Sequence, residues 1–145
     1  MTYVEYFSAQ KELYQRIMIP ICKAYDITFT ELSILLFLAN NPQYNTATQI
    51  VEIRHLAKSH VSTSLRSLEE RGFLRREFRG SDRRTVYIVL LPASAKAIAD
   101  GQEAQKTFFS FLFKDFTDEE KKTFDEMFHR IINNILESLE NPDVH

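Results

Sequence analysis

Side chains that could contact a nucleic acid recur at helical spacing between residues 58 and 72. On a helix at about 100° per residue, one face carries hydroxyl groups and a guanidinium, from Ser59, Ser62, Thr63 and Arg66. The opposite face carries a narrow apolar stripe that must face a core, formed by Ala57, Val61, Leu65 and Leu68. Because the first half of the polar face carries no acid, this helix suits the major groove of DNA. An ordinary amphipathic helix with a solvated face would show the same pattern.

The charge of the chain is unevenly distributed. Residues 54–84 contain nine lysines and arginines and four acids, a net charge of +5, whereas the whole chain has a net charge of −2. A basic middle segment in an acidic frame is the electrostatic footprint expected of a protein that binds a polyanion. The near-neutral total therefore does not argue against nucleic-acid binding.

Composition excludes several classes of protein. The 145 residues suit one domain, and no apolar run approaches the roughly 20 residues that span a bilayer. The N-terminus lacks the layout of a secretory signal, so we expect a cytoplasmic protein without a membrane segment. The single cysteine, Cys22, excludes an internal disulfide and a thiolate zinc site. With three glycines there is no phosphate-binding loop, and no nucleophile motif is present, so we expect neither an enzyme nor a cofactor.

Helices are predicted before the polar stretch. Residues 2–25 carry apolar side chains at helical spacing, with a kink or a break expected at Pro20. Thr28-Phe-Thr-Glu31 is a capping box that opens a second helix, which ends near Asn40-Asn-Pro42. Thr46-Ala-Thr-Gln49 opens a short third helix, and a tight turn near residues 55–57 leads to the helix over residues 58–71. Two short helices joined by about four residues make a helix-turn-helix.

The hydrophobic period changes to two after Gly72, which supplies a C-terminal stop for the helix. Residues 73–79 and 85–91 are predicted strands, joined by a hairpin tip over residues 80–84. Gly80 suits the turn, and Asp82 can fold its side chain back onto the backbone or onto an arginine. Arg83 and Arg84 lie at the tip with Arg79 close behind, so the hairpin is predicted to be a basic wing beside the basic helix.

Two further helices are predicted after Pro92, which ends the second strand. One covers residues 93–113; a third capping box in Phe116-Thr-Asp-Glu-Glu120 opens the other, which runs to about Asn141, with a frayed end at 141–143. Phenylalanines crowd the first of these helices, and the last keeps an apolar stripe for over four turns. A winged helix alone has limited surface to cover them, so we expect a C2 homodimer. A monomer with a thicker core is the alternative.

The order of these elements and four motifs resemble the MarR (multiple antibiotic resistance regulator) family of winged-helix transcription factors. The motifs are Thr28-x-x-Glu31, Lys58-Ser-His-Val-Ser, Leu68-Glu-x-x-Gly-Phe-Leu-x-Arg76 and Asp82-Arg-Arg84. The resemblance implies a mainly α (α+β) fold, with a winged helix-turn-helix over residues 29–92 and a helical dimerisation region over residues 1–28 and 93–145. The chain departs from the family pattern at Leu91, Pro92 and Ala95, where many members have Leu-Thr-x-x-Gly.

The same resemblance implies a DNA-binding regulator, expected to be a repressor on a pseudo-palindromic duplex site. It places Ser59, His60, Ser62, Thr63 and Arg66 near bases or phosphates, and Asp82 and Arg84 in a wing from which an arginine enters the minor groove. Lys58, Arg79 and Arg83 complete the candidate DNA-binding residues. The sequence does not decide whether Arg83 or Arg84 enters the groove.

Rival sites and functions carry weaker signals. Some relatives resemble peroxide sensors with a first-helix cysteine, but Cys22 has only Lys23 to favour a thiolate, and a buried structural cysteine is the commoner case. No metal site is expected, since His55 and His60 share no helix face and His129 and His145 are isolated. A small aromatic or lipophilic effector is implied by the family, in a crevice lined by the first helix and the phenylalanine-rich stretch. A winged helix that binds a protein is a further alternative.

Overall fold

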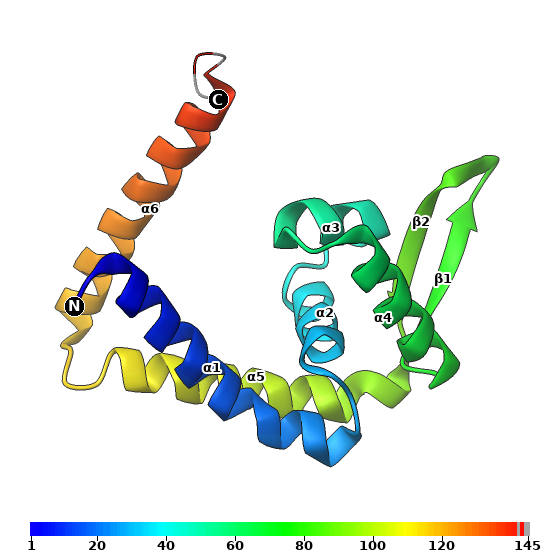
Figure 1. The fold of residues 1–145 in the computed structure, drawn as a ribbon, viewed down its shortest axis with the longest axis horizontal. Helices are drawn as coiled ribbons and strands as arrows, with labels where there is room; N and C mark the ends of the chain where they lie inside the picture. Colours follow the sequence, from blue (N-terminus) through cyan, green and yellow to red (C-terminus); the bar gives the residue numbers. More distant parts are fainter. Residues whose placement is uncertain (142, 144–145) are drawn as a thin grey trace. The chain divides into compact units, whose positions relative to one another are not determined.

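The computed structural model describes residues 1–141 and 143, and it divides into two compact units, Met1–Phe108 and Phe109–His145. Figure 1 follows the elements along the chain. In order, the described residues form α1 (Tyr3–Tyr25), α2 (Phe29–Asn40), α3 (Ala47–Arg54), α4 (Lys58–Glu70), β1 (Leu74–Arg79), β2 (Asp82–Leu90), a 3-10 turn η1 (Pro92–Ser94), α5 (Ala95–Leu112) and α6 (Asp118–Glu140). This order confirms the mainly α, winged helix-turn-helix prediction.

Threonine N-caps start four of these helices. The predicted capping boxes at Thr46 and Thr117 are both complete, with the third helical residue bonding back to the cap. At Thr28 only half of the predicted box forms: its Oγ1 accepts the Glu31 backbone N–H at 3.0 Å, but the Glu31 side chain is buried and makes no return bond. A complete box at Thr2 was not predicted.

Helix α1 continues without a break through Pro20, so the predicted break is wrong. Proline removes one backbone donor, and α1 otherwise keeps its helical assignment to Tyr25. The predicted long helix after Pro92 begins as the 3-10 turn, and its α-helical part starts at Ala95. The expected frayed end falls partly on residue 142, which lies outside the described residues, as does His145.

Helix α2 lies at the centre of the core of the first unit. It is buried almost all round, because its sequence places aliphatic residues on every face; buried members are Leu32, Ile34, Leu35, Leu36 and Leu38. Buried residues of α1, α3, α4, β1 and β2 join the same cluster, including Met18, Ile50, Leu65, Leu74 and Ile88. This cluster holds the helix-turn-helix and the hairpin as one body.

The hairpin departs from the predicted register. β2 begins at Asp82, so the turn contains only Gly80 and Ser81, and the predicted tip over residues 80–84 is wrong. The antiparallel pairing is regular from Leu74–Leu90 to Glu77–Tyr87 and then shifts, so that Arg79 pairs with Asp82. This bulge places extra β2 residues opposite Phe78. Thr46 adds an isolated bridge to Tyr87, which ties the start of α3 to the sheet.

The second unit contains an aromatic cluster at the start of α6. The Phe113 ring lies 5.5 Å from the Phe116 ring and 5.1 Å from the Phe124 ring, between centroids, and Phe124 stacks on Phe128. None of the residues of α6, Phe124 and Phe128 included, is buried. Its large apolar side chains are exposed, namely Met127, Ile131, Ile135, Leu136 and Leu139. Among the described residues, no helix has the length and hydrophobicity to cross a bilayer.

Gly101 of α5 lies close against side chains of α2. A Cβ atom built there would lie 2.9 Å from Cδ2 of Leu36, which is itself buried. We predict that Gly101→Val lowers the free energy of unfolding by about 1–3 kcal/mol, because the added methyl groups overpack this contact. In Gly101→Ala the gain in helix propensity opposes a smaller overlap, so this variant should stay nearer the wild type. Urea unfolding followed by circular dichroism measures both, and equal stability of the valine variant and the wild type would contradict the packing argument.

Candidate nucleic-acid interface

The two faces of α4 are divided largely as predicted. Val61, Leu65 and Leu68 are buried, and the whole predicted polar face is exposed: Lys58, Ser59, His60, Ser62, Thr63 and Arg66. Ala57 was assigned to the apolar stripe, and that assignment is wrong. It lies outside the helix as an exposed N-cap, because the chain leaves the turn after α3 there, and Ser64, two turns further along, is buried instead.

The N-terminus of α4 keeps its backbone donors available. The cap residue Ala57 offers no side-chain hydrogen bond, and no acid lies in the first turn. The first N–H groups of a helix lack intrahelical acceptors and carry partial positive charge, which favours an anion. His55, the left-handed cap of α3 with φ of 51°, turns the chain so that α4 starts at this point.

Asp82 shapes the wing by binding its own backbone. Its Oδ1 accepts the N–H of Arg84 at 2.8 Å and that of Thr85 at 3.4 Å. These bonds, with that of Arg84 the largest cause, lower the pKa of Asp82. The predicted fold-back onto the backbone is therefore confirmed. Gly80, with φ of +59°, supplies the left-handed residue of the preceding turn.

The three wing arginines differ in what holds them. The Arg79 guanidinium lies 4.2 Å from the Tyr87 ring centroid and donates to Glu77, and that of Arg83 lies 5.5 Å from the Phe78 ring. The Arg84 side chain makes no hydrogen bond, ion pair or ring contact with the residues that the structure describes. Arg84 is thus the wing arginine most available to a ligand. The sequence analysis did not predict the contacts of Arg79 with Tyr87 and of Arg83 with Phe78, because cross-strand neighbours can be identified only once the register of the hairpin is known.

Glu69 joins α4 to the base of the wing. Its Oε2 accepts from Nε of Arg76 at 2.7 Å and from the Arg76 backbone N–H at 3.1 Å. The hydrogen bond from the Arg76 side chain is the main cause that lowers the pKa of Glu69. In the same way Arg79 and Arg75 flank Glu77 and lower its pKa. Glu69 and Glu77 therefore form ion pairs with arginines of the same segment. Counting charges in the sequence does not reveal these pairs.

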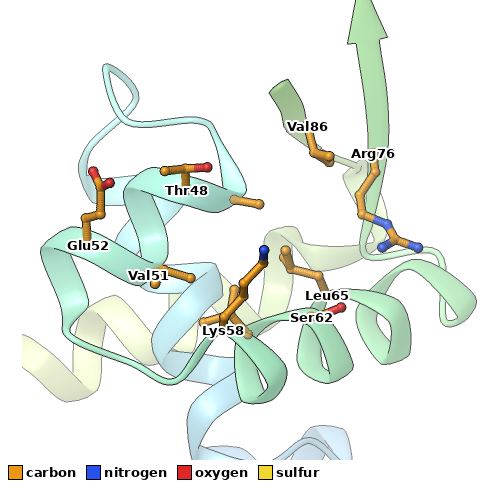
Figure 2. Close-up of a pocket in the computed structure, with 10 residues that line it drawn as sticks. Thr48, Val51, Glu52, Lys58, Ser62, Leu65, Arg76 and Val86 are labelled. Carbon is orange, nitrogen blue, oxygen red and sulfur yellow. The ribbon is translucent and has the colours of Figure 1, made fainter. Parts of the chain in front are cut away.

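A hollow of about 310 Å³ lies between α3, α4 and the two strands. Its wall is largely apolar, with Val51, Leu65 and Val86, and Figure 2 shows the Lys58 side chain reaching into it from α4. Arg76 borders it on the strand side. The Lys58 ammonium, the Glu52 carboxylate and the Arg76 guanidinium therefore border a hollow beside the polar face of α4, and Arg76 is already paired with Glu69.

The rival sites fit the structure less well. Cys22 is buried, and burial is the main cause that raises the pKa of its thiol, with the charge of Glu31 adding to the effect. This is the environment of a core cysteine. In the first helix, which was expected to line an effector crevice, Tyr14 packs its ring against Phe29 and against buried Phe108. Within residues 1–141 and 143, no group of three or more metal-ligating side chains comes together.

Comparison with known proteins agrees with this geometry. The sequence model of the MarR family matches residues 25–85. This segment, which contains the helix-turn-helix and most of the wing, is therefore similar to the MarR family. A curated relative, the uncharacterized HTH-type transcriptional regulator YwhA of Bacillus subtilis (strain 168), is 38% identical over 69 residues, or 48% of this chain and 50% of the relative. The chain thus spans about half the length of this relative in the match.

Solved MarR-type structures share the fold over almost the whole chain. The crystal structure of MarR has a TM-score of 0.77 at 20% identity and covers 94% of this chain and 92% of its own. The S. aureus MepR–DNA complex has a TM-score of 0.73 at 20% identity, with 93% and 98% covered. A putative MarR family regulator from Listeria monocytogenes, complexed with a 26mer DNA, has a TM-score of 0.79 at 13% identity, with 93% and 89% covered. At these identities the likeness establishes the fold.

The environment of Cys22 predicts that its thiol reacts slowly with alkylating reagents. Since the raised pKa leaves less thiolate at pH 8 and the side chain is buried, alkylation by iodoacetamide should be at least about tenfold slower in the folded protein than in urea. The rate is measured by mass spectrometry over time. Faster alkylation of the folded protein would instead identify a reactive thiol and revive the redox interpretation.

Proposed function

We propose that this protein regulates transcription by binding specific sites on double-stranded DNA. The observation that carries the proposal is the exposed face of α4, where donors and a guanidinium lie beside a wing that bears three arginines. The net charge of +5 over residues 54–84 supplies the long-range attraction. The DNA complexes of two regulators with the same fold lend support.

In this proposal α4 enters the major groove. Ser59, Ser62 and Thr63 offer hydroxyls to bases or phosphates, and Arg66 can form the bidentate contact that guanine favours. Lys58 and His60, at the start of α4, would meet the phosphates. Of the wing residues, Arg84 would enter the adjacent minor groove, while Asp82 keeps the wing in shape and Arg79 and Arg83 face the backbone.

We further propose that the protein works as a C2 homodimer, with residues 29–92 as the DNA-binding part and residues 1–28 and 93–145 as the dimerisation region. The start of α1 exposes Tyr3, Val4 and Phe7, and α6 exposes a long apolar stripe. Apolar surface of this extent is typical of an interface. Two copies would present two α4 helices to the half-sites of a pseudo-palindrome. Repression relieved by a small aromatic or lipophilic effector is the form of regulation we infer, and a cytoplasmic location follows from it.

Binding of the purified protein to random and genomic duplex DNA tests the proposed function. Affinity should fall steeply as salt rises from about 50 to 300 mM, because bound lysines and arginines release counterions, and some fragments should be held far more tightly. These fragments would contain the operator. The absence of binding at low salt would overturn the proposal and favour a winged helix that binds a protein.

The two tip arginines provide a matched pair of variants. Arg84→Ala should weaken binding and make the salt dependence shallower by about 0.9 in slope, since one phosphate or groove contact is lost. Arg83→Ala should have a smaller effect, because its guanidinium is already held at Phe78. Fluorescence anisotropy across salt measures both slopes. A larger effect at Arg83 would exchange the two roles.

Dimerisation is tested on the apolar stripe of α6. Ile131→Glu places a charge among exposed apolar side chains, and it should weaken self-association at least about tenfold because a buried aliphatic contact contributes more than 1.4 kcal/mol. Asn133→Glu, on the opposite helix face, adds the same charge as a control. Sedimentation velocity over a concentration series reports the monomer fraction. If the wild type sediments as a monomer throughout, the dimer proposal is wrong.

A further inference from the structure

Arg71 connects the end of α4 to the end of α1. It is the C-cap of α4, and its Nη2 donates to the Tyr25 carbonyl at 2.7 Å while its Nη1 donates to the Asp26 carbonyl. Tyr25 is the last residue of α1, and Asp26 is its left-handed C-cap with φ of 51°. Carbonyls at a helix C-terminus lack intrahelical donors and carry partial negative charge, so the planar guanidinium fork satisfies both at once.

The same connection continues into α5. The Tyr25 hydroxyl donates to Oδ2 of Asp100 at 2.5 Å, and this hydrogen bond is the main cause that raises the pKa of Tyr25. The partners are 45, 46 and 75 residues apart in the sequence, so these are tertiary contacts between elements that meet only in the fold. All of them lie within the first unit. One chain of contacts therefore joins α4, α1 and α5.

Arg71 lies at the junction between α4 and β1, where the backbone N–H groups of Gly72 and Phe73 donate to the carbonyls of Glu69 and Leu68. Gly72 follows it with φ of +72° and open space around the position of a Cβ, so the backbone there has the freedom of glycine. The guanidinium also lies 4.9 Å from the ring centroid of Phe73, on the far side of the glycine. Bonds to α1 on one side and a ring contact on the other restrain the direction in which α4 leaves this junction.

We propose that Arg71 is a positioning residue, which fixes the orientation of α4 through α1 and thereby sets DNA specificity without touching DNA. The inference rests on the proposed function. It also gives α1 and α5, which we assign to dimerisation, a physical route to α4: a shift of the end of α1 changes the anchor of the DNA-reading helix. An arginine at the end of a basic helix would otherwise be assigned to a phosphate.

Three variants separate positioning from phosphate contact. Arg71→Ala removes the fork, Arg71→Lys keeps the charge but cannot bridge two carbonyls in one plane, and Lys23→Ala, in the last turn of α1, is a charge-matched control. Affinity for the operator and for random duplex is measured across salt. We expect both Arg71 variants to lose about fivefold or more on the operator only, with an unchanged salt slope, and Lys23→Ala to match the wild type.

Other outcomes overturn the inference. A slope shallower by about 0.9 in Arg71→Ala, restored by Arg71→Lys, would make Arg71 a phosphate contact, and unchanged operator affinity would give it no role. Should Arg71→Ala unfold, Arg71→Lys carries the test of the fork, and unchanged operator affinity in that variant would overturn the inference. Tyr25→Phe leaves the carbonyl that Arg71 binds and removes only the hydrogen bond to Asp100, so it tests the continuation from α1 to α5.

Amide hydrogen exchange needs no DNA and separates this inference from the proposed function. Folded Arg71→Ala should exchange faster than Lys23→Ala in the second half of α4 and at the end of α1, because the anchor between them is lost. Equal exchange would overturn the anchor even if the wild type binds its operator. If Arg71→Ala exchanges faster but the wild type binds no DNA, Arg71 still anchors α4 to α1, and the proposed role of Arg71 in DNA specificity is wrong.

Discussion

Burial of one apolar stripe on α4 determines which of its side chains can meet a ligand. Val61, Leu65 and Leu68 are almost wholly inaccessible, and they belong to the cluster built around α2. Because α2 is apolar on nearly every face, it must be covered all round, and α4 is one of the elements that cover it. Because the apolar face of α4 packs on this core, the opposite face must point into solvent. Its hydroxyls and Arg66 are left in solvent as a consequence of packing.

Three of the four acids in residues 54–84 are held by local partners. Glu69 is paired with Arg76, Glu77 with Arg75 and Arg79, and Asp82 with backbone N–H groups of the wing. Carboxylates held in this way have lowered pKa values and stay charged, but their charge is spent on local partners. These pairs engage arginines as well as acids, so the positive charge of the segment comes from its excess of nine lysines and arginines over four acids in residues 54–84. Stacking of Arg79 and Arg83 on aromatic rings restricts those guanidinium groups further.

The sequence predicted what local physics decides. Threonine caps, the glycine stop and the change of period from helix to strand mark elements that need few distant partners, and most of their boundaries agree with the structure to within a few residues. The errors fall where distant contacts decide. The Glu31 side chain is buried in the core and therefore does not form the predicted capping bond. The hairpin bulge depends on the pairing between β1 and β2, which no local sequence pattern reveals. The contacts of Arg71 with Tyr25 and Asp26 span 45 or more residues and were likewise beyond pattern reading.

Exposed apolar surface is the one conflict that a single copy of this chain leaves open. Seven large apolar side chains of α6 are between 46% and 71% exposed, and the start of α1 adds Tyr3, Val4 and Phe7. Single exposed apolar residues need no explanation, but a continuous stripe on a long helix costs free energy in water. Under the proposed homodimer, the same surface that stabilises the pair would also fix the spacing of two α4 helices. DNA affinity would then depend on protein concentration, because two half-sites can be engaged together only by the associated form.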